Sequence, residues 1–269
     1  MNNVKIAILS FLAVLGSISS IAQNKLDKQD RKDEKRAKIN QMLKLEEEGE
    51  PGYAKHGIFH FKFNTDGYGF GYEIGRSKSI FNTTIYQIEF NEKKHRKEEK
   101  QSRGSGNFVF GNPFVFGKQN YFYQVKLGIG QQRMIGGKGN KNGVGVFGIY
   151  ALGLTAGLER PYYIDVQDPP NSGKVRTISY SKADSAVFMS PEILGGSGLK
   201  GWNEMNIVPG FHAKTALRFD WGRFNNTISA VEAGFNFEYY TKKIDQMVGV
   251  APTAFFMNGY LAVLFGNRK

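Results

Sequence analysis

The sequence has no cysteine among its 269 residues, only two tryptophans and only eight prolines. Without cysteine there are no disulfides, thiolate metal sites or cysteine nucleophiles, and no lipid-modified N-terminal cysteine. An apolar run of the roughly 20 residues that a transmembrane helix needs is missing as well. The residues in excess are glycine (33), phenylalanine (22) and tyrosine (13), which favour strands and tight turns over helix bundles. Composition therefore predicts an all-β protein.

The formal net charge is +12 and the sequence pI is about 9.6. The bases alternate with acids instead of gathering on one recognition element, and no nucleic-acid motif accompanies them. We therefore expect no nucleic-acid partner. A basic surface of this kind suits anionic lipid headgroups or an acidic protein.

The first 52 residues divide into two segments. Residues 1–22 have Lys5 in a short polar lead, an apolar run from Ile6 to Leu15, and small residues at Ser20 and Ala22; this pattern predicts a secretory signal peptide cleaved after Ala22. Residues 23–52 are densely charged with a thin apolar stripe, which predicts a helical or disordered periplasmic arm, acting either as a flexible tether or as a docking helix.

From Gly57 onward the pattern of apolar residues has a period of two, which is the signature of β-strands. Alternation predicts about eight strands, near residues 57–63, 68–75, 80–90, 121–130, 144–158, 210–221, 229–239 and 254–266. Long outer loops are expected near 92–118 and 159–204, the second as the longest irregular stretch. Residues 107–117 contain Pro113, which would interrupt a central ladder, so they are either part of the loop or a strand extension.

The stretch "GFHAKTALRFDWGR" (Gly210–Arg223) shows one apolar and one charged face. Strands of ten to fifteen residues exceed those of most soluble sheets and match the nine to eleven or more that cross a bilayer at a tilt. We therefore predict an antiparallel transmembrane β-barrel of about eight strands over residues 53–269, with the apolar face in lipid. Eight strands leave an interior that side chains fill, so no diffusion pore is expected.

The predicted faces name two sets of residues. The polar lumen is expected to hold Lys62, Glu73, Glu89, Lys126, His212, Lys214, Arg218, Asp220, Glu232 and Glu238. The lipid-facing set is Phe211, Leu217, Phe219, Trp221, Phe235, Phe237 and Tyr239. For His212, Lys214, Arg218 and Asp220 the expected partners are Glu232 and Glu238 on the next strand, because buried charges persist only when paired.

The sequence offers no catalytic, cofactor or metal site. None of the four histidines has a serine two positions on, so an acyl-transfer pair is not indicated, and His212 is expected to hydrogen-bond in the lumen. "GGKGNKNG" lacks the ending of a phosphate loop. His56 and His60 flank a strand start and are expected to share a face only on a helix.

Two loop segments are candidates for contacts. The charged run Glu92–Arg103 is either a solvated loop or a contact for lipopolysaccharide phosphates. The apolar stretch "SAVFMSPEIL" lies where water is expected, and we predict that it contacts a protein partner. Its contact residues are Val187, Phe188, Met189, Ile193 and Leu194.

Five segments carry a family resemblance: "YGFGYEIGRS", "FGKQNYFYQVKLGIGQQRMIGGKGNKNGV", "LERPYYIDV", "GFHAKTALRFDWGR" and "FFMNGYLAVLFGNRK". In their order and spacing the chain resembles small, largely uncharacterised outer-membrane β-barrel proteins of Bacteroidota. Its last strand departs from the usual barrel ending, because a polar, basic tail follows Phe265. The resemblance carries no catalytic motif and implies an accessory subunit of a larger outer-membrane machine.

Together these patterns predict a non-enzymatic, integral outer-membrane barrel with the N-terminal arm and the C-terminus in the periplasm. Its expected partners are membrane lipid, lipopolysaccharide and the other proteins of a complex for protein insertion, barrel assembly or secretion. A lipid A-modifying barrel enzyme and a small-solute channel are the alternatives.

Overall fold

The structure is a computed structural model that describes residues 31–34, 36, 37, 40, 54–79, 81–105, 108–138, 143–167, 173–191, 193–222 and 227–269; for 103–105 and 108–110 it describes the backbone. The chain forms two units, residues 1–52 and 53–269. In the first unit the described residues of the charged arm are helical, with an exposed ion pair between Arg36 and Asp33 at 3.7 Å. The expected signal peptide lies outside the described residues.

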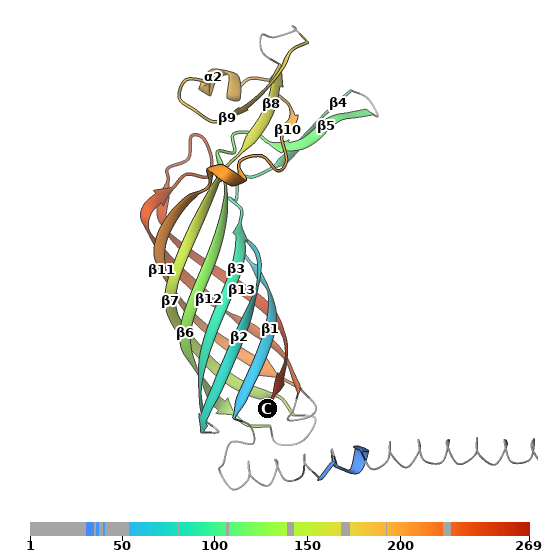
Figure 1. Ribbon diagram of the computed structural model, residues 1–269, viewed down its shortest axis with the longest axis vertical. Helices are drawn as coiled ribbons and strands as arrows, with labels where there is room; N and C mark the ends of the chain where they lie inside the picture. The colour runs from blue at the N-terminus through green and yellow to red at the C-terminus, as the bar shows by residue number, and fades with distance from the viewer. Residues whose placement is uncertain are drawn as a thin grey trace, which may run out of the picture. The chain divides into compact units, whose positions relative to one another are not determined.

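Eight antiparallel strands of the second unit close into a barrel (Figure 1). They are β1 (Lys55–Asn64), β2 (Gly67–Ser79), β3 (Asn82–Lys93), β6 (Asn120–Gly136), β7 (Gly145–Pro161), β11 (Asn206–Asp220), β12 (Thr227–Ile244) and β13 (Thr253–Arg268). Their order around the barrel is β1-β13-β12-β11-β7-β6-β3-β2, and β1 pairs with β13 to close it. The predicted fold class, an eight-stranded antiparallel barrel, is confirmed.

The strands reach beyond the stretches of clean alternation. β6, β7 and β12 have 17, 17 and 18 residues, because β6 and β7 continue past the predicted C-terminal ends and β12 continues past both of its predicted ends. The basic tail is part of the wall, since Arg268 pairs with His56 in the β1–β13 ladder and Lys269 exchanges backbone hydrogen bonds with Lys55. We call the end of the barrel with Lys55 and Lys269 the terminal end.

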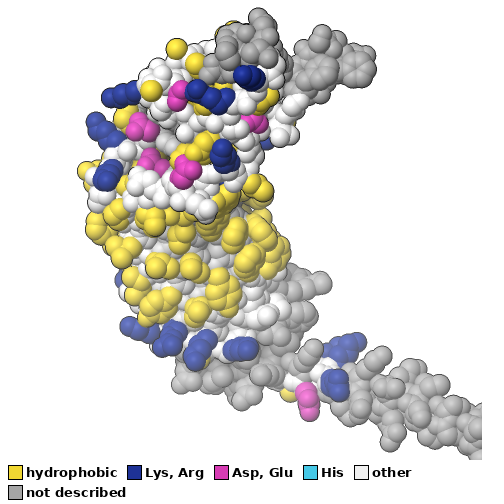
Figure 2. Space-filling view, turned by 45° about the horizontal axis from the view of Figure 1, so that its top comes forward, with side chains coloured by type: hydrophobic (Ala, Val, Ile, Leu, Met, Phe, Trp, Pro, Cys, Tyr) yellow, Lys and Arg dark blue, Asp and Glu magenta, His cyan; other side chains and the backbone are white. Residues whose placement is uncertain are grey.

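Hydrophobic side chains point outward from the barrel strands and form a band around the wall (Figure 2). Exposed members include Phe59, Phe70, Leu154, Phe211 and Leu261. Charged side chains point inward and are buried, so the barrel is inside out compared with a soluble one. An apolar outer band with a polar interior is the arrangement of a barrel that crosses a lipid bilayer. The chain is a transmembrane β-barrel.

The end opposite the terminal end carries a folded cap, made by the described residues within 94–119, 162–205 and 245–252 (Figure 1). It contains the hairpin β4 (Lys100–Ser105)–β5 (Phe108–Val115) and the sheet β10-β8-β9, formed by β8 (Tyr163–Gln167), β9 (Val175–Ser179) and β10 (Ile193–Gly196). Helix α2 (Ser185–Phe188) and the short helix η1 (Trp202–Glu204) complete it. Among the described residues no helix has the length and apolar character needed to span a membrane.

The cap corrects the expectation that residues 159–204 are irregular. Phe114 from β5 packs with Ile164, Val166, Ile178 and Phe188 in a separate buried cluster. The loops are also tied by backbone hydrogen bonds, such as Gln119 N–H to the Gln246 carbonyl at 2.8 Å. Burial of this second apolar core orders loops that a polar, glycine-rich sequence would otherwise leave irregular. Residues 108–115 of the ambiguous segment form strand β5 of the cap hairpin.

The outward band predicts a large penalty for a charge in the middle of the wall. Leu154 lies near the centre of β7 and is 60% exposed, so Leu154→Arg should destabilise the membrane-inserted barrel by about 2–4 kcal/mol. Val175→Arg is the matched control, because Val175 is 61% exposed in the cap. Urea unfolding in lipid vesicles measures both, and equal effects would contradict the lipid-facing assignment.

Candidate functional site in the barrel lumen

The lumen contains all ten residues that the sequence placed there. Each is at most 7% exposed, and they come from six of the eight strands. Alternation explains the placement, because the residues next to each exposed aromatic or aliphatic side chain point to the other face of the strand. The chemistry of the lumen therefore depends on how these charges are paired.

Arg218 connects opposite parts of the wall. Its two terminal nitrogens contact both carboxylate oxygens of Glu73 at 2.7 and 2.8 Å, and its Nε and Nη2 donate to Glu232 at 2.9 and 2.7 Å. Gln132 accepts a further bond from Arg218 at 2.9 Å. A guanidinium can satisfy two carboxylates in this way because its donors lie in a planar fork. One side chain thus joins strands β2, β6, β11 and β12.

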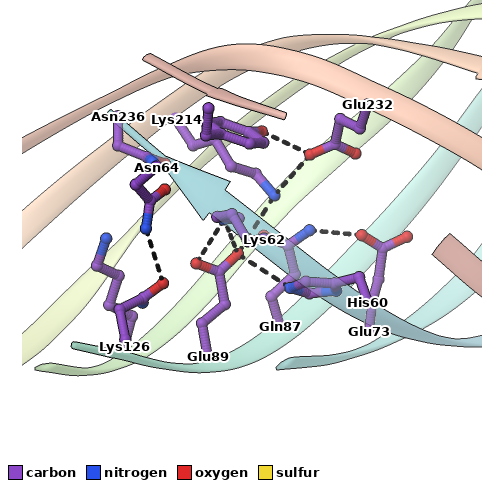
Figure 3. Close-up of polar contacts among 12 residues, drawn as sticks. His60, Lys62, Asn64, Glu73, Gln87, Glu89, Lys126, Lys214, Glu232 and Asn236 are labelled. Carbon is purple, nitrogen blue, oxygen red and sulfur yellow. Dashed lines mark hydrogen bonds and ion pairs between the residues drawn. The ribbon is translucent and has the colours of Figure 1, made fainter. Parts of the chain in front are cut away.

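A second group of charges surrounds Glu89 (Figure 3). Lys62 donates to both oxygens of Glu89 at 2.7 Å, Lys214 lies 3.5 Å from it, and His60 lies 3.6 Å from it. Lys214 also reaches Glu232 at 3.3 Å. Because Glu232 is shared, the Glu89 group and the Arg218 group form one continuous network.

Towards the cap, Glu238 is the centre of a third group. Lys126 and Lys93 both pair with it, Lys93 at 2.9 Å, and Gln124 donates to it at 2.7 Å. Lys93 continues to Asp66 at 2.7 Å. Towards the terminal end, Asp220 pairs with Arg268 and with Lys138 at 3.3 Å. Paired charges are therefore distributed along the lumen, which they share with two buried apolar clusters, one around Ile85 and Leu264 and one around Phe122 and Tyr240.

The pairing differs in part from the prediction. Glu232 does take Arg218 and Lys214, but Glu238 takes lysines from β6 and β3 instead of residues of β11. Asp220 pairs with cations at its own end of the barrel. It does not pair with the predicted partners Glu232 and Glu238, because like charges repel. His212 stands beside Glu238 in register, yet its Nδ1 has no hydrogen-bond partner among the described residues.

Sequence reasoning missed part of the lumen and was wrong about two histidines. His56 and His60 both point inward and are 3% exposed, and His56 contacts Glu73 at 3.1 Å. An even spacing of four residues puts both on one face of a strand, so no helix is needed. The other missed lumen residues include Gln87, Asn91, Lys93, Gln124, Gln132, Asn236, Asn258 and Tyr260. Gln87, Gln124, Asn236, Asn258 and Tyr260 lie inside the predicted strands on the inward face, and strict alternation continued past the strand ends would have added Asn91, Lys93 and Gln132.

Glycines on the inward face leave space for the histidines. A Cβ on Gly75 would lie 2.1 Å from the ring of His56, one on Gly71 would lie 2.6 Å from His60, and one on Gly153 would lie 2.6 Å from His212. A real Cβ cannot approach a ring so closely, so the glycines are part of the packing of the lumen.

The lipid-facing set lies on the outer wall. Phe211, Leu217, Phe219, Trp221, Phe235 and Tyr239 are between 38% and 62% exposed, and Phe237 is partly exposed. In the cap, by contrast, Phe188 and Ile193 are only 1% and 3% exposed. These two belong to the cap's own core, which corrects the expectation that they contact a partner. Val187 and Leu194 are partly buried, and Met189 is 38% exposed.

Tyr162 links the cap core to its hairpin. Its hydroxyl accepts a hydrogen bond from the backbone N–H of Val115 at 2.9 Å. Burial raises the pKa of Tyr162 to about 12, because a phenolate would lose its hydration there. The residue therefore stays neutral and serves the packing of the cap.

A large groove of about 840 Å³ lies on the outer wall. It crosses six neighbouring strands. Its lining follows two rows of residues that are paired across these strands, Tyr150–Thr215–Phe235–Gly259 and Gly148–Leu217–Ala233–Leu261. The small outward residues of the two rows form its floor: Gly148, Thr215, Ala233 and Gly259. Phe63, Ile135, Phe235 and Leu261 are among its larger lining residues. The groove therefore faces the lipid and not the lumen.

Within the described residues, no group of three or more histidine, aspartate or glutamate side chains is arranged to hold a metal ion. His56 and His60 lie beside carboxylates that Arg218 and Lys62 already neutralise. The physical effect of this arrangement is that paired charges block the lumen.

No protein-family model and no curated protein matches the chain. Among solved structures it is similar to the N-terminal β-barrel domain of Pseudomonas aeruginosa OprF, at 11% identity and a TM-score of 0.36 over 80% of this chain and 98% of that one. It is also similar to the attachment invasion locus protein Ail of Yersinia pestis (10%, 0.35, 81% and 99%) and to Neisserial surface protein A (8%, 0.36, 80% and 96%).

The network predicts that removal of its central cation is costly. Arg218→Met leaves Glu73 and Glu232 buried without their shared partner, which should cost about 3–5 kcal/mol of unfolding free energy. The control is Arg176→Met, because the exposed pair of Arg176 with Asp184 in the cap should be worth about 0–1 kcal/mol. Urea unfolding in vesicles compares them, and a small loss for Arg218→Met would show that the lumen is hydrated.

The inward glycines predict a steric defect with a specific rescue. Gly75→Ala should destabilise the barrel by about 1–3 kcal/mol, because the new methyl group overlaps the ring of His56. Combining it with His56→Ala should recover part of that loss. Gly259→Ala is the control, since a Cβ there would lie 3.7 Å from the nearest side-chain atoms, those of Phe235 and Thr65. Thermal unfolding monitored by heat-modifiable gel mobility reports all three, and no difference between the two glycines would refute the steric account.

Proposed function

We propose that this chain is a non-enzymatic, integral outer-membrane β-barrel that serves as an accessory or structural subunit of a larger outer-membrane complex, one for protein insertion, barrel assembly or secretion. In this proposal the terminal end, with the N-terminal arm, faces the periplasm and the cap faces outward. The single observation that carries the subunit role is the groove in the lipid-facing wall.

The groove suits a transmembrane segment of a partner protein. Lipid tails are as apolar as the protein's outer side chains, so the hydrophobic effect does not drive two proteins together inside a membrane. Close packing has to drive their association instead. Small residues allow that packing because they let two backbones approach each other. Gly148, Thr215, Ala233 and Gly259 offer such a floor across neighbouring strands, between larger lining side chains such as Phe63, Phe235 and Leu261.

The state of the lumen argues against the two alternatives. A small-solute channel needs an open path, and the lumen is crossed by the Arg218, Glu89 and Glu238 groups. A lipid A-modifying enzyme needs a catalytic base on the lipid side, but His212 points into the lumen and is 7% exposed. Steady ion conductance of the purified barrel in a planar bilayer would overturn the first of these arguments.

A bulky side chain in the groove should block the partner. We expect Ala233→Trp to lose a stoichiometric partner when an affinity-tagged chain is isolated from native membranes in mild detergent. Leu152→Trp is the control, because Leu152 is 65% exposed on the same wall but does not line the groove, and it should keep the partner. Recovery of wild type as a lone monomer at full yield would contradict the subunit role, and equal retention by all forms would contradict the groove.

A further inference from the structure

The outward charges of the barrel are distributed unequally between its two ends. At the terminal end, five exposed bases point outward: Lys55, Arg76, Lys78, Arg133 and Lys269. They lie on the outward faces of β1, β2, β6 and β13 at the edge of the hydrophobic band, and on β6 the exposed Ile135 follows Arg133. Among the described residues of the barrel strands, no aspartate or glutamate points outward at this end, since Glu73 and Asp220 are buried in the lumen. We call these five bases the basic rim.

Three members of the basic rim are held side by side by the ladder. Lys55 pairs in register with Arg76 on β2. Lys55 and Lys269 exchange two backbone hydrogen bonds of 2.8 Å. On the face shown in Figure 2, Lys and Arg side chains form a row along the lower edge of the hydrophobic band, with no acidic side chain in that row. The other edge carries both signs, for example Glu92 and Lys94.

A pocket of about 320 Å³ lies within this rim. It is lined by Lys55 and Lys269, by the amide of Asn267, and by Tyr72 and Ile74 on the side of the band. Gly57 opens it, and the Tyr72 hydroxyl occupies the place of the missing side chain, 2.5 Å from where a Cβ would be. The pocket thus combines cations, hydrogen-bond donors and an apolar side that continues into the lipid-facing wall.

This combination fits one ligand chemistry. Phosphate esters are recognised by lysine and arginine together with neutral donors. A headgroup at the edge of a bilayer presents a phosphate above acyl chains, which matches cations placed above Ile74 and the aromatic band. Bases near an anionic leaflet gain affinity from each phosphate, and acids among them would cancel that gain.

We propose that the basic rim binds the phosphates of anionic phospholipids in the leaflet at the terminal end, and that the pocket between Lys55, Lys269 and Tyr72 holds one such headgroup. This inference rests on the proposed function, which places the barrel in a membrane with that end towards the periplasm. The rim then fixes the depth of the barrel, because a cation at the headgroup level resists movement into the hydrocarbon.

The test uses the full chain purified in detergent and native mass spectrometry with phosphatidylglycerol or phosphatidylcholine of the same acyl chains. Wild type should retain phosphatidylglycerol in preference to phosphatidylcholine. The triple variant Lys55→Gln, Arg76→Gln, Lys269→Gln should lose that preference by about tenfold or more, because each base removed weakens attraction to an anionic surface about fivefold. The matched control is Lys200→Gln, Lys242→Gln, Lys243→Gln, three exposed bases of the cap end, and it should behave as wild type.

Insertion is measured separately, by heat-modifiable mobility and vesicle flotation of each variant. A wild-type chain that does not insert would refute the proposed function. An inserted wild type without headgroup preference, or equal losses in the two triple variants, would overturn the basic rim as the site.

Discussion

Pairing of buried charges in the lumen is the constraint on which the barrel depends. Lipid outside the wall accepts no charge, so the polar residues of every strand must point inward, where little water is left to solvate them. Each ion is then tolerated only with partners of opposite charge. Arg218 meets this requirement for Glu73 and Glu232 at once, and Glu89 and Glu238 are each shared by two lysines. The network therefore links strands that are not neighbours in the ladder order, such as β2 and β11.

The same constraint explains the glycines and the histidines. A lumen of eight strands is narrow, and long charged side chains from opposite walls must share it with rings. Gly75 and Gly153 lack a side chain at the positions where the rings of His56 and His212 lie. Outside the membrane water is available again, and the cap is organised by a different force, the burial of Phe114, Phe188 and Ile193 in a small apolar core. One chain thus contains two kinds of packing, with opposite polarity.

The face of each barrel residue could be predicted from the sequence, whereas its partner could not. Alternation assigns Lys62 or Glu238 to the lumen because a one-residue shift would put the charge in lipid. The pairing of Arg218 with Glu73, 145 residues away, depends on barrel closure and on the stagger of the strands, which no local pattern records. Lys93 and His56 were missed because they lie at strand ends, outside the clean apolar repeat. The cap was missed because its short strands join residues from separate loops.

The two surfaces that remain for partners follow from what the lumen excludes. A lumen closed by ion pairs leaves the outer wall and the two edges as the places where this barrel can recognise anything. The wall groove is apolar and built on small residues, so it suits close packing in the hydrocarbon. The basic rim carries one sign of charge and lies where the apolar band ends, so it suits phosphates at the membrane surface. The two surfaces differ in chemistry and meet at Arg133, which belongs to both, and a barrel that uses both would be held at a fixed height while it packs against a neighbour.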